Sequence, residues 1–76
     1  MLFLTDDPSE AIKLLREAEP SKLERWAMFL DLVITDDTAA MVASDMFDEA
    51  YTIEYIRDEA RRTAIAIRTH LNALVQ

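Results

Sequence analysis

The spacing of apolar residues in the last third of this sequence is its strongest constraint on the fold. Between positions 53 and 74 they recur every three or four residues, and six steps cover 21 residues, an average of about 3.5. A narrow stripe with this period is typical of a helix that packs lengthwise against another helix. The repeat consists of Ile53, Ile56, Ala60, Ala64, Ile67, Leu71 and Leu74. The sequence therefore predicts a long C-terminal helix and an all-α fold.

Shorter helices are predicted before it. Asp7 and Pro8 are typical of a helix start, and Pro20 disfavours helical geometry in the residue before it, which ends that helix. Residues 21–24 form a capping box for a second helix, and a Thr-Asp-Asp-Thr stretch precedes a third. No glycine or proline marks the boundary near 50–52, which is inferred from length alone. We expect one domain over residues 1–76, a small bundle of three to four helices at about 8–19, 22–34, 38–50 and 53–75.

The residue types that are missing exclude several classes of enzyme. The chain contains no glycine, no cysteine and one histidine. Without glycine, the phosphate-binding loop, the dinucleotide fingerprint and the strained nucleophile turn lack the residue on which their geometry depends. Without cysteine there is no disulfide, thiol nucleophile or cysteine-containing zinc site. Sequence spacing places no nucleophile beside His70. We expect no enzyme activity, no catalytic residue, no cofactor and no metal.

The charge of the chain bears on its partners and its location. The chain contains eight Lys and Arg residues and 15 Asp and Glu residues, which gives a net charge of −7. This charge repels phosphate backbones and argues against direct nucleic-acid binding. The longest apolar stretch, 26–34, is nine residues interrupted by Asp31, far short of the ~20 that span a bilayer. The first residues also lack the basic leader of a secretory signal. We expect a cytoplasmic protein without membrane contact.

The acids are concentrated in the first two thirds of the chain. Residues 1–52 contain twelve acids and four bases, whereas residues 53–76 contain three acids and four bases. This asymmetry predicts an acidic face that steers the chain toward a basic surface on another protein. The candidate residues are Asp31, Asp36, Asp37, Asp45, Asp48 and Glu49. The alternative is that these carboxylates only keep the surface solvated.

An aromatic patch is the second candidate surface. Phe29, Tyr51 and Tyr55 fall off or at the edge of the apolar stripes. With Met28 and Met41 they predict an exposed binding patch, because tyrosine and methionine are enriched at interfaces. The alternative is that a bundle wrapped on two sides buries the same residues.

A homodimer contact is the third candidate surface. The last helix is longer than the others, so its stripe is expected to overhang the bundle and to pair with a second copy. The predicted dimer seam comprises Ile56, Ala60, Ala64, Ile67, Leu71 and Leu74.

In size, acidity and helical make-up the chain resembles small inhibitory proteins of phages and mobile elements, such as anti-CRISPR proteins and DNA mimics, and bacterial immunity proteins. The likeness is one of composition and assigns no residue. It implies a protein that binds a partner protein and inhibits or modulates it by steric occlusion. If that partner binds nucleic acid, the carboxylates of the acidic face are expected to stand in for phosphates. One alternative is a structural or regulatory dimerisation module. A more remote one is a small metal-dependent phosphohydrolase that uses the carboxylates of Asp45, Asp48 and Glu49 and of Glu54 and Asp58.

Overall fold

The computed structural model describes residues 3–75, and this part of the chain folds into four helices without a strand. They are α1 (Pro8–Glu17), α2 (Pro20–Thr35), α3 (Asp37–Met46) and α4 (Ile53–Leu74). The predicted all-α fold with a long C-terminal helix is confirmed. Within residues 3–75, no helix combines the length and the apolar content that crossing a membrane requires.

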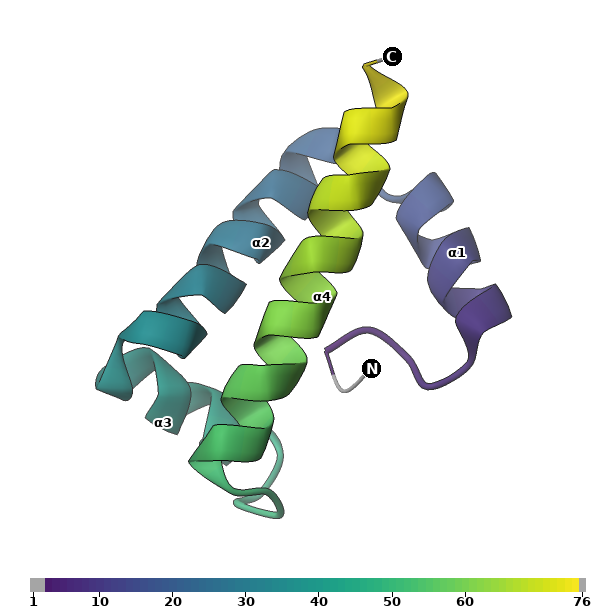
Figure 1. Cartoon of the computed structure of the whole chain (residues 1–76). Helices are drawn as coiled ribbons and strands as arrows, with labels where there is room; N and C mark the ends of the chain where they lie inside the picture. Colours follow the sequence, from purple (N-terminus) through teal and green to yellow (C-terminus); the bar gives the residue numbers. More distant parts are fainter. Residues whose placement is uncertain (1–2, 76) are drawn as a thin grey trace.

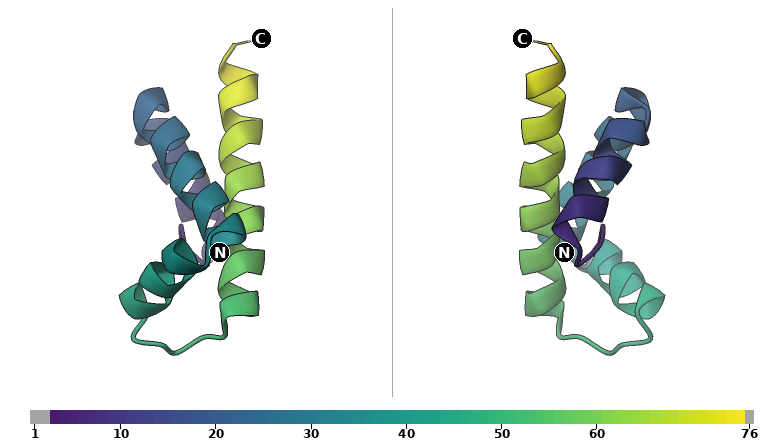
Figure 2. Two further views of the ribbon diagram at one scale, coloured as in Figure 1. Left: turned by 90° about the vertical axis from the view of Figure 1, so that its left-hand side faces the viewer. Right: turned by 90° about the vertical axis from the view of Figure 1, so that its right-hand side faces the viewer.

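Helix α4 is the longest helix, and the other three pack on one side of it (Figures 1 and 2). It runs antiparallel to α2, which flanks it on one side, while α1 flanks it on the other (Figure 1). In side view α1, α2 and α3 all lie on the same side of α4 (Figure 2). The turn between α1 and α2 and the loop between α3 and α4 therefore lie at opposite ends of the molecule (Figure 1).

The core is a seam between α2 and α4 to which α1, α3 and the N-terminal segment add a few residues. Its largest fully buried side chains include Leu30, Val33, Ile56 and Ile67. Alanines between them let the two helix backbones approach closely. The buried apolar cluster comprises Phe3, Leu15, Leu23, Ala27, Leu30, Val33, Ala43, Ile56, Ala60, Ala64 and Ile67.

The predicted dimer seam is corrected by this core. Ile56, Ala60, Ala64 and Ile67 are at most 3% exposed and pack inside the chain, so they are not available to a second copy. The physical reason is that α2 presents a matching apolar stripe along most of α4. Of the two remaining seam residues, Leu71 is half-buried against the core and Leu74 is exposed.

The boundary between α1 and α2 also differs from the prediction, because Pro20 begins a helix as well as ending one. Helix α1 ends at Glu17, two residues earlier than expected, and Ala18 and Glu19 are extended. Helical geometry is disfavoured just before a proline. Pro20 then occupies the first helical position of α2, where a backbone N–H is not needed. The capping box predicted at 21–24 consequently lies inside α2.

Helix α3 buries small side chains. Ala40, Ala43 and Ser44 are buried, whereas the larger apolar residues Val42 and Met46 are 51% and 55% exposed. Small residues on the inner face let α3 pack close to both α2 and α4. Its larger apolar side chains therefore point to solvent.

The aromatic residues form one continuous series of ring contacts that includes all six in the chain. Phe3, from the N-terminal segment, contacts both Trp26 and Phe47 edge-on and so joins the two halves of this series. In order the series is Phe29, Trp26, Phe3, Phe47, Tyr51 and Tyr55, with ring centroids 5.2, 6.3, 5.4, 6.0 and 5.1 Å apart. The N-terminal segment thus connects α2 to the end of α3.

We predict that Phe3→Ala lowers the free energy of unfolding by about 3 kcal/mol, because Phe3 is only 9% exposed and its loss leaves a cavity between two rings. Urea unfolding measures the loss, and the emission of Trp26 should shift to longer wavelength as water reaches its ring. Phe3→Leu, which keeps most of the volume, should cost less than about 1.5 kcal/mol. A loss below about 1 kcal/mol for Phe3→Ala would show that this segment does not belong to the core.

Candidate protein-binding site

The loop at residues 47–52 closes α3 with a Schellman motif that contains no glycine. The backbone N–H of Glu49 donates to the carbonyl of Ser44 at 2.9 Å, and that of Asp48 donates to the carbonyl of Asp45 at 3.1 Å. These two bonds are the pair that defines the motif. Asp48 and Glu49 have positive φ angles of 55° and 57°. Both carboxylates are exposed on this loop.

This loop explains why the predicted end of the third helix is wrong. Helix α3 ends at Met46, whereas its end was expected at position 50. The left-handed region is usually occupied by glycine and tolerates aspartate, but a glutamate there costs about 1–2 kcal/mol. A helix end is usually recognised in a sequence by a glycine or a proline. This one is formed by two consecutive non-glycine residues, so the sequence pattern does not reveal it. Backbone strain of this kind is concentrated at functional sites.

Two tyrosines stack beside the loop. The rings of Tyr51 and Tyr55 have centroids 5.1 Å apart and an interplanar angle of 18°, and the residues are 41% and 46% exposed. The Thr52 hydroxyl accepts a hydrogen bond from the backbone N–H of Tyr55 at 3.1 Å and caps α4. A hydrogen bond to the Glu59 carboxylate raises the pKa of Tyr55, since it stabilises the neutral phenol, and the charge of Glu59 adds to the effect.

The six predicted acidic-face residues do not form one face. Asp36 and Asp37 lie at the corner between α2 and α3, and Asp31 lies one turn earlier on α2; all three are engaged within the fold. The other three are exposed at the end of α3 and in the loop, and they form no ion pair within residues 3–75. We call this second group, together with the stacked tyrosines, the acidic tip: Asp45, Asp48, Glu49, Tyr51 and Tyr55.

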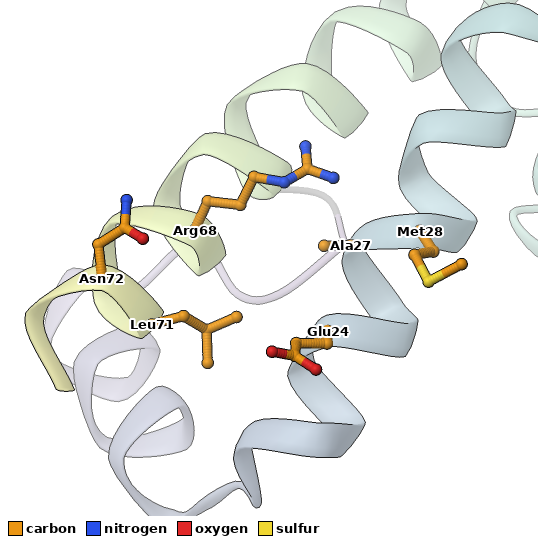
Figure 3. A pocket seen from close by; sticks show the side chains of 6 residues that line it. All are labelled: Glu24, Ala27, Met28, Arg68, Leu71 and Asn72. Atoms are coloured by element: carbon orange, nitrogen blue, oxygen red, sulfur yellow. The ribbon is translucent and has the colours of Figure 1, made fainter. Parts of the chain in front are cut away.

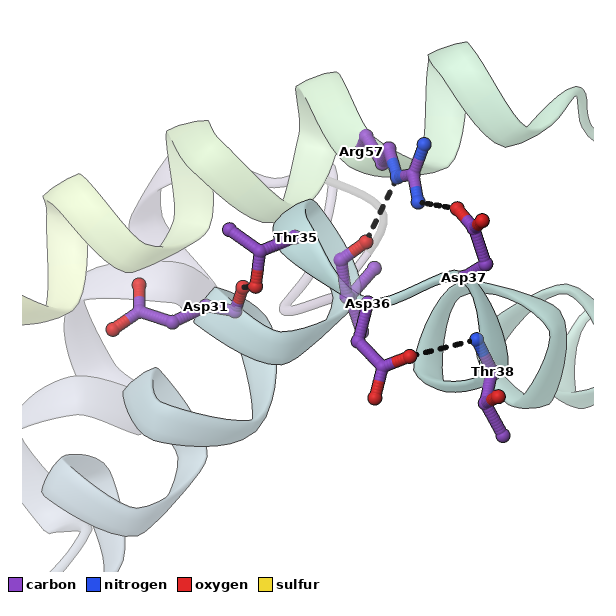
Figure 4. A network of polar contacts seen from close by, with 7 residues as sticks. Asp31, Thr35, Asp36, Asp37, Thr38 and Arg57 are labelled. Atoms are coloured by element: carbon purple, nitrogen blue, oxygen red, sulfur yellow. Dashed lines mark hydrogen bonds and ion pairs between the residues drawn. The ribbon is translucent and has the colours of Figure 1, made fainter.

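Arg57 holds the corner between α2 and α3 against α4 (Figure 4). Its Nε donates to the carbonyl of Val33 at 3.1 Å, and its Nη2 donates to Asp37 at 2.7 Å. The Val33 carbonyl belongs to the last turn of α2, where carbonyls lack partners within the helix. Asp36 accepts a hydrogen bond from the backbone N–H of Thr38 at 3.0 Å and caps α3. The sequence does not predict this role for Arg57, since contacts between distant segments have no signature in spacing.

Asp31 forms a two-pronged ion pair with Arg68 that joins α2 to α4. The Arg68 Nη1 donates to Oδ1 of Asp31 at 2.9 Å, and Nη2 donates to Oδ2. The hydrogen bonds from Arg68 lower the pKa of the Asp31 carboxyl below its usual value. Both side chains are about half exposed, so the pair contributes modestly to stability.

The predicted aromatic patch is divided between two places. Phe29 is half-buried and its ring lies 5.2 Å from that of Trp26, at the opposite end of the aromatic series from the tyrosines. Met28 and Met41 are each 64% exposed, as expected, but they belong to different helices. Of the predicted patch, only Tyr51 and Tyr55 lie together.

Within the described residues, no three histidine, aspartate or glutamate side chains are grouped so that they would hold a metal ion. Comparisons of this chain with known protein families, curated proteins and solved structures found no match.

We predict that Arg57→Ala lowers the free energy of unfolding by about 2 kcal/mol. Removal of this largely buried side chain leaves the Val33 carbonyl without its charged donor. Chemical denaturation measures the change. Arg62→Ala is the matched control, because Arg62 makes only an exposed pair with Asp58 at 3.3 Å and should lose less than about 0.5 kcal/mol. Equal losses in the two variants would contradict this role for Arg57.

The Asp31–Arg68 pair should make stability depend on pH in the acid range. Because the folded pKa of Asp31 lies below its ordinary value of 3.8, the pair contributes fully above that pH and is lost as the pH falls through the folded pKa. A double-mutant cycle with Asp31→Asn and Arg68→Gln should give a coupling energy of about 0.5–1 kcal/mol at neutral pH. The coupling should shrink toward zero once Asp31 is protonated, and a pH-independent coupling would be inconsistent with this pair.

Proposed function

We propose that this chain is a non-enzymatic protein that binds a basic surface of another protein through the acidic tip and thereby blocks that surface. The observation that carries the proposal is the tip itself. There, three exposed carboxylates free of ion pairs within residues 3–75 lie beside two stacked, partly exposed tyrosines. Such a surface offers both charge and ring faces to a cationic side chain.

The carboxylates and the tyrosine rings of the tip both favour contact with arginine and lysine side chains of a partner. Carboxylates attract either cation and raise the rate of encounter. An aromatic ring face binds a guanidinium or an ammonium by a cation–π contact of about 0.5–1 kcal/mol at an exposed site. Tyr51 and Tyr55 stack on each other, and Phe47 also contacts Tyr51, so the 46% exposed Tyr55 offers the less enclosed ring to a partner.

The tip is pre-organised, which favours binding. The Schellman bonds fix the start of the loop, and the Thr52 cap fixes its end. Between them, Phe47 packs edge-on against both Phe3 and Tyr51, which attaches the loop to the core. A surface that is already ordered loses less conformational entropy when it binds.

The proposal extends to inhibition. Basic surfaces on proteins often bind phosphates, and the carboxylates of the tip would take the place of phosphates on such a surface. Occupation of that surface would exclude its nucleic-acid ligand, as an inhibitor of the phage or mobile-element kind does in the cytoplasm. The net charge of −7 assists the approach to a basic partner and opposes direct binding of nucleic acid.

The test uses a fluorescein-labelled peptide of nine arginines as the basic probe, with binding followed by fluorescence anisotropy at low salt. The double variant Asp48→Asn/Glu49→Gln should bind about fivefold more weakly, since two exposed ion pairs of about 0.5 kcal/mol each are lost. Tyr51→Ala should weaken binding as well, whereas Tyr51→Phe should retain it. Binding to the wild-type chain should weaken steadily as salt rises.

The control variant, Glu17→Gln/Glu19→Gln, removes the same charge from the turn between α1 and α2 at the other end of the molecule (Figure 1). It should change binding by less than about twofold. Equal weakening in the two double variants would mean that the peptide responds to net charge alone, and the proposal would fail.

A further inference from the structure

A second exposed surface lies where α2 flanks α4. A groove of about 420 Å³ opens there toward the C-terminal end of α4 (Figure 3). Its lining comprises Glu24, Ala27, Met28, Arg68, Leu71 and Asn72. Arg61 and Ile65 continue this surface along α4, because residues 61, 65, 68 and 72 fall on one side of a helix at spacings of three and four. We use the name groove face for six residues on this surface: Glu24, Met28, Asp31, Arg61, Ile65 and Arg68.

The groove face exposes two large apolar side chains on different helices. Met28 on α2 is 64% exposed, and Ile65 on α4 is 65% exposed. Met28 lies three residues before Asp31 on α2, and Ile65 lies three residues before Arg68 on α4, while the half-buried Leu71 lines the groove together with Met28. Covering such side chains would remove apolar surface from water, which is favourable in proportion to the area covered.

The charges on this face are balanced, unlike those of the chain as a whole. Asp31 pairs with Arg68, whereas Glu24 and Arg61 have no ion-pair partner within residues 3–75. The face therefore holds two acids and two bases, in a chain with 15 acids and eight bases. It contains one unpaired acid at one end and one unpaired base at the other.

We propose that the groove face is where a second copy of this chain binds, in a two-fold symmetric dimer. In such a contact the same surface is used by both copies, so it must be complementary to itself. A two-fold axis passing near Met28 and Ile65 places Glu24 of each copy opposite Arg61 of the other. The apolar side chains then meet near the axis, and two reciprocal ion pairs flank them.

The two unpaired charges are far enough apart along the helices to leave room for the apolar side chains between them. Glu24 lines the groove together with Asn72, which lies eleven residues beyond Arg61 on α4. At 1.5 Å per residue the unpaired charges are separated by about 16 Å along the helix. An interface of standard size covers about 800 Å² on each partner. That is roughly a seventh of the 5282 Å² surface of the chain.

A second copy fits this face better than the basic partner proposed for the acidic tip. Two chains with a net charge of −7 repel each other over most of their surface. Contact between copies therefore requires a face without excess charge, and the groove face meets that requirement. A basic protein, in contrast, gains nothing from a surface on which Arg61 is exposed and unpaired.

The experiment measures the mass of the whole chain by sedimentation velocity over concentrations from about 1 to 200 μM. At the higher concentrations the sedimenting species of the wild-type protein should have twice the mass of one chain. Ile65→Glu should weaken the dimer at least about tenfold, since it places two carboxylates near the axis. Ile12→Glu is the matched control, because Ile12 is an exposed isoleucine, at 52%, and belongs to α1, which flanks the other side of α4 (Figure 1). It should leave the dimer unchanged.

Charge reversal tests the reciprocal pairs. Glu24→Arg and Arg61→Glu should each weaken self-association about tenfold, because like charges then meet twice. A mixture of the two variants should recover a dimer within about threefold of wild type, as should the double variant. Circular dichroism should show that each variant is folded, since Glu24 and Arg61 are both exposed.

Several results would contradict a dimer formed through the groove face. A chain that stays monomeric at about 200 μM overturns the proposal. A dimer that survives Ile65→Glu, that is lost with Ile12→Glu, or that the mixture fails to restore also overturns it. Peptide binding by the acidic tip is measured on different residues, so either proposal can fail while the other stands.

Discussion

The burial of the apolar stripe of α4 against α2 is the interaction on which the rest of the structure depends. In a chain of 76 residues this seam supplies most of the fully buried large side chains, among them Leu30, Ile56 and Ile67. Small domains have little stability to spare, so a helix of this length must bury its stripe somewhere. Because α2 covers the stripe within the chain, the surfaces left for partners are those that the seam does not use.

Two such surfaces differ in chemistry. At the α3–α4 end, a glycine-free Schellman motif presents Asp48 and Glu49 beside stacked tyrosines, and the excess negative charge suits a basic partner. Along the junction of α2 and α4, exposed Met28 and Ile65 flank balanced charges. A basic partner would approach the first surface by ionic steering, whereas contact between copies at the second would be favoured mainly by apolar burial.

Much of the fold follows from local sequence rules. The period of the last segment predicted α4, and Pro8 marked the start of α1. The errors arose where the outcome depends on tertiary contact or on rare backbone geometry. Spacing shows that Ile56 and Ile67 share a face but does not say whether α2 or a second copy covers it. Likewise, nothing in the sequence marks Glu49 as a residue that adopts a positive φ.

The acidic candidates show the same division between pattern and context. Composition identified a surplus of carboxylates, but only the folded chain separates Asp31 and Asp37, which pair with Arg68 and Arg57, from those left unpaired at the tip within residues 3–75. Exposed ion pairs are worth at most about 1 kcal/mol each, so a single tip would bind a basic surface weakly. The proposed dimer bears on this weakness. The groove lies toward the C-terminal end of α4, away from the tip at its N-terminal end, and pairing through it leaves two tips uncovered (Figures 1 and 3). Two linked tips on a symmetric partner gain affinity through effective concentration, which a monomer with the same contacts lacks.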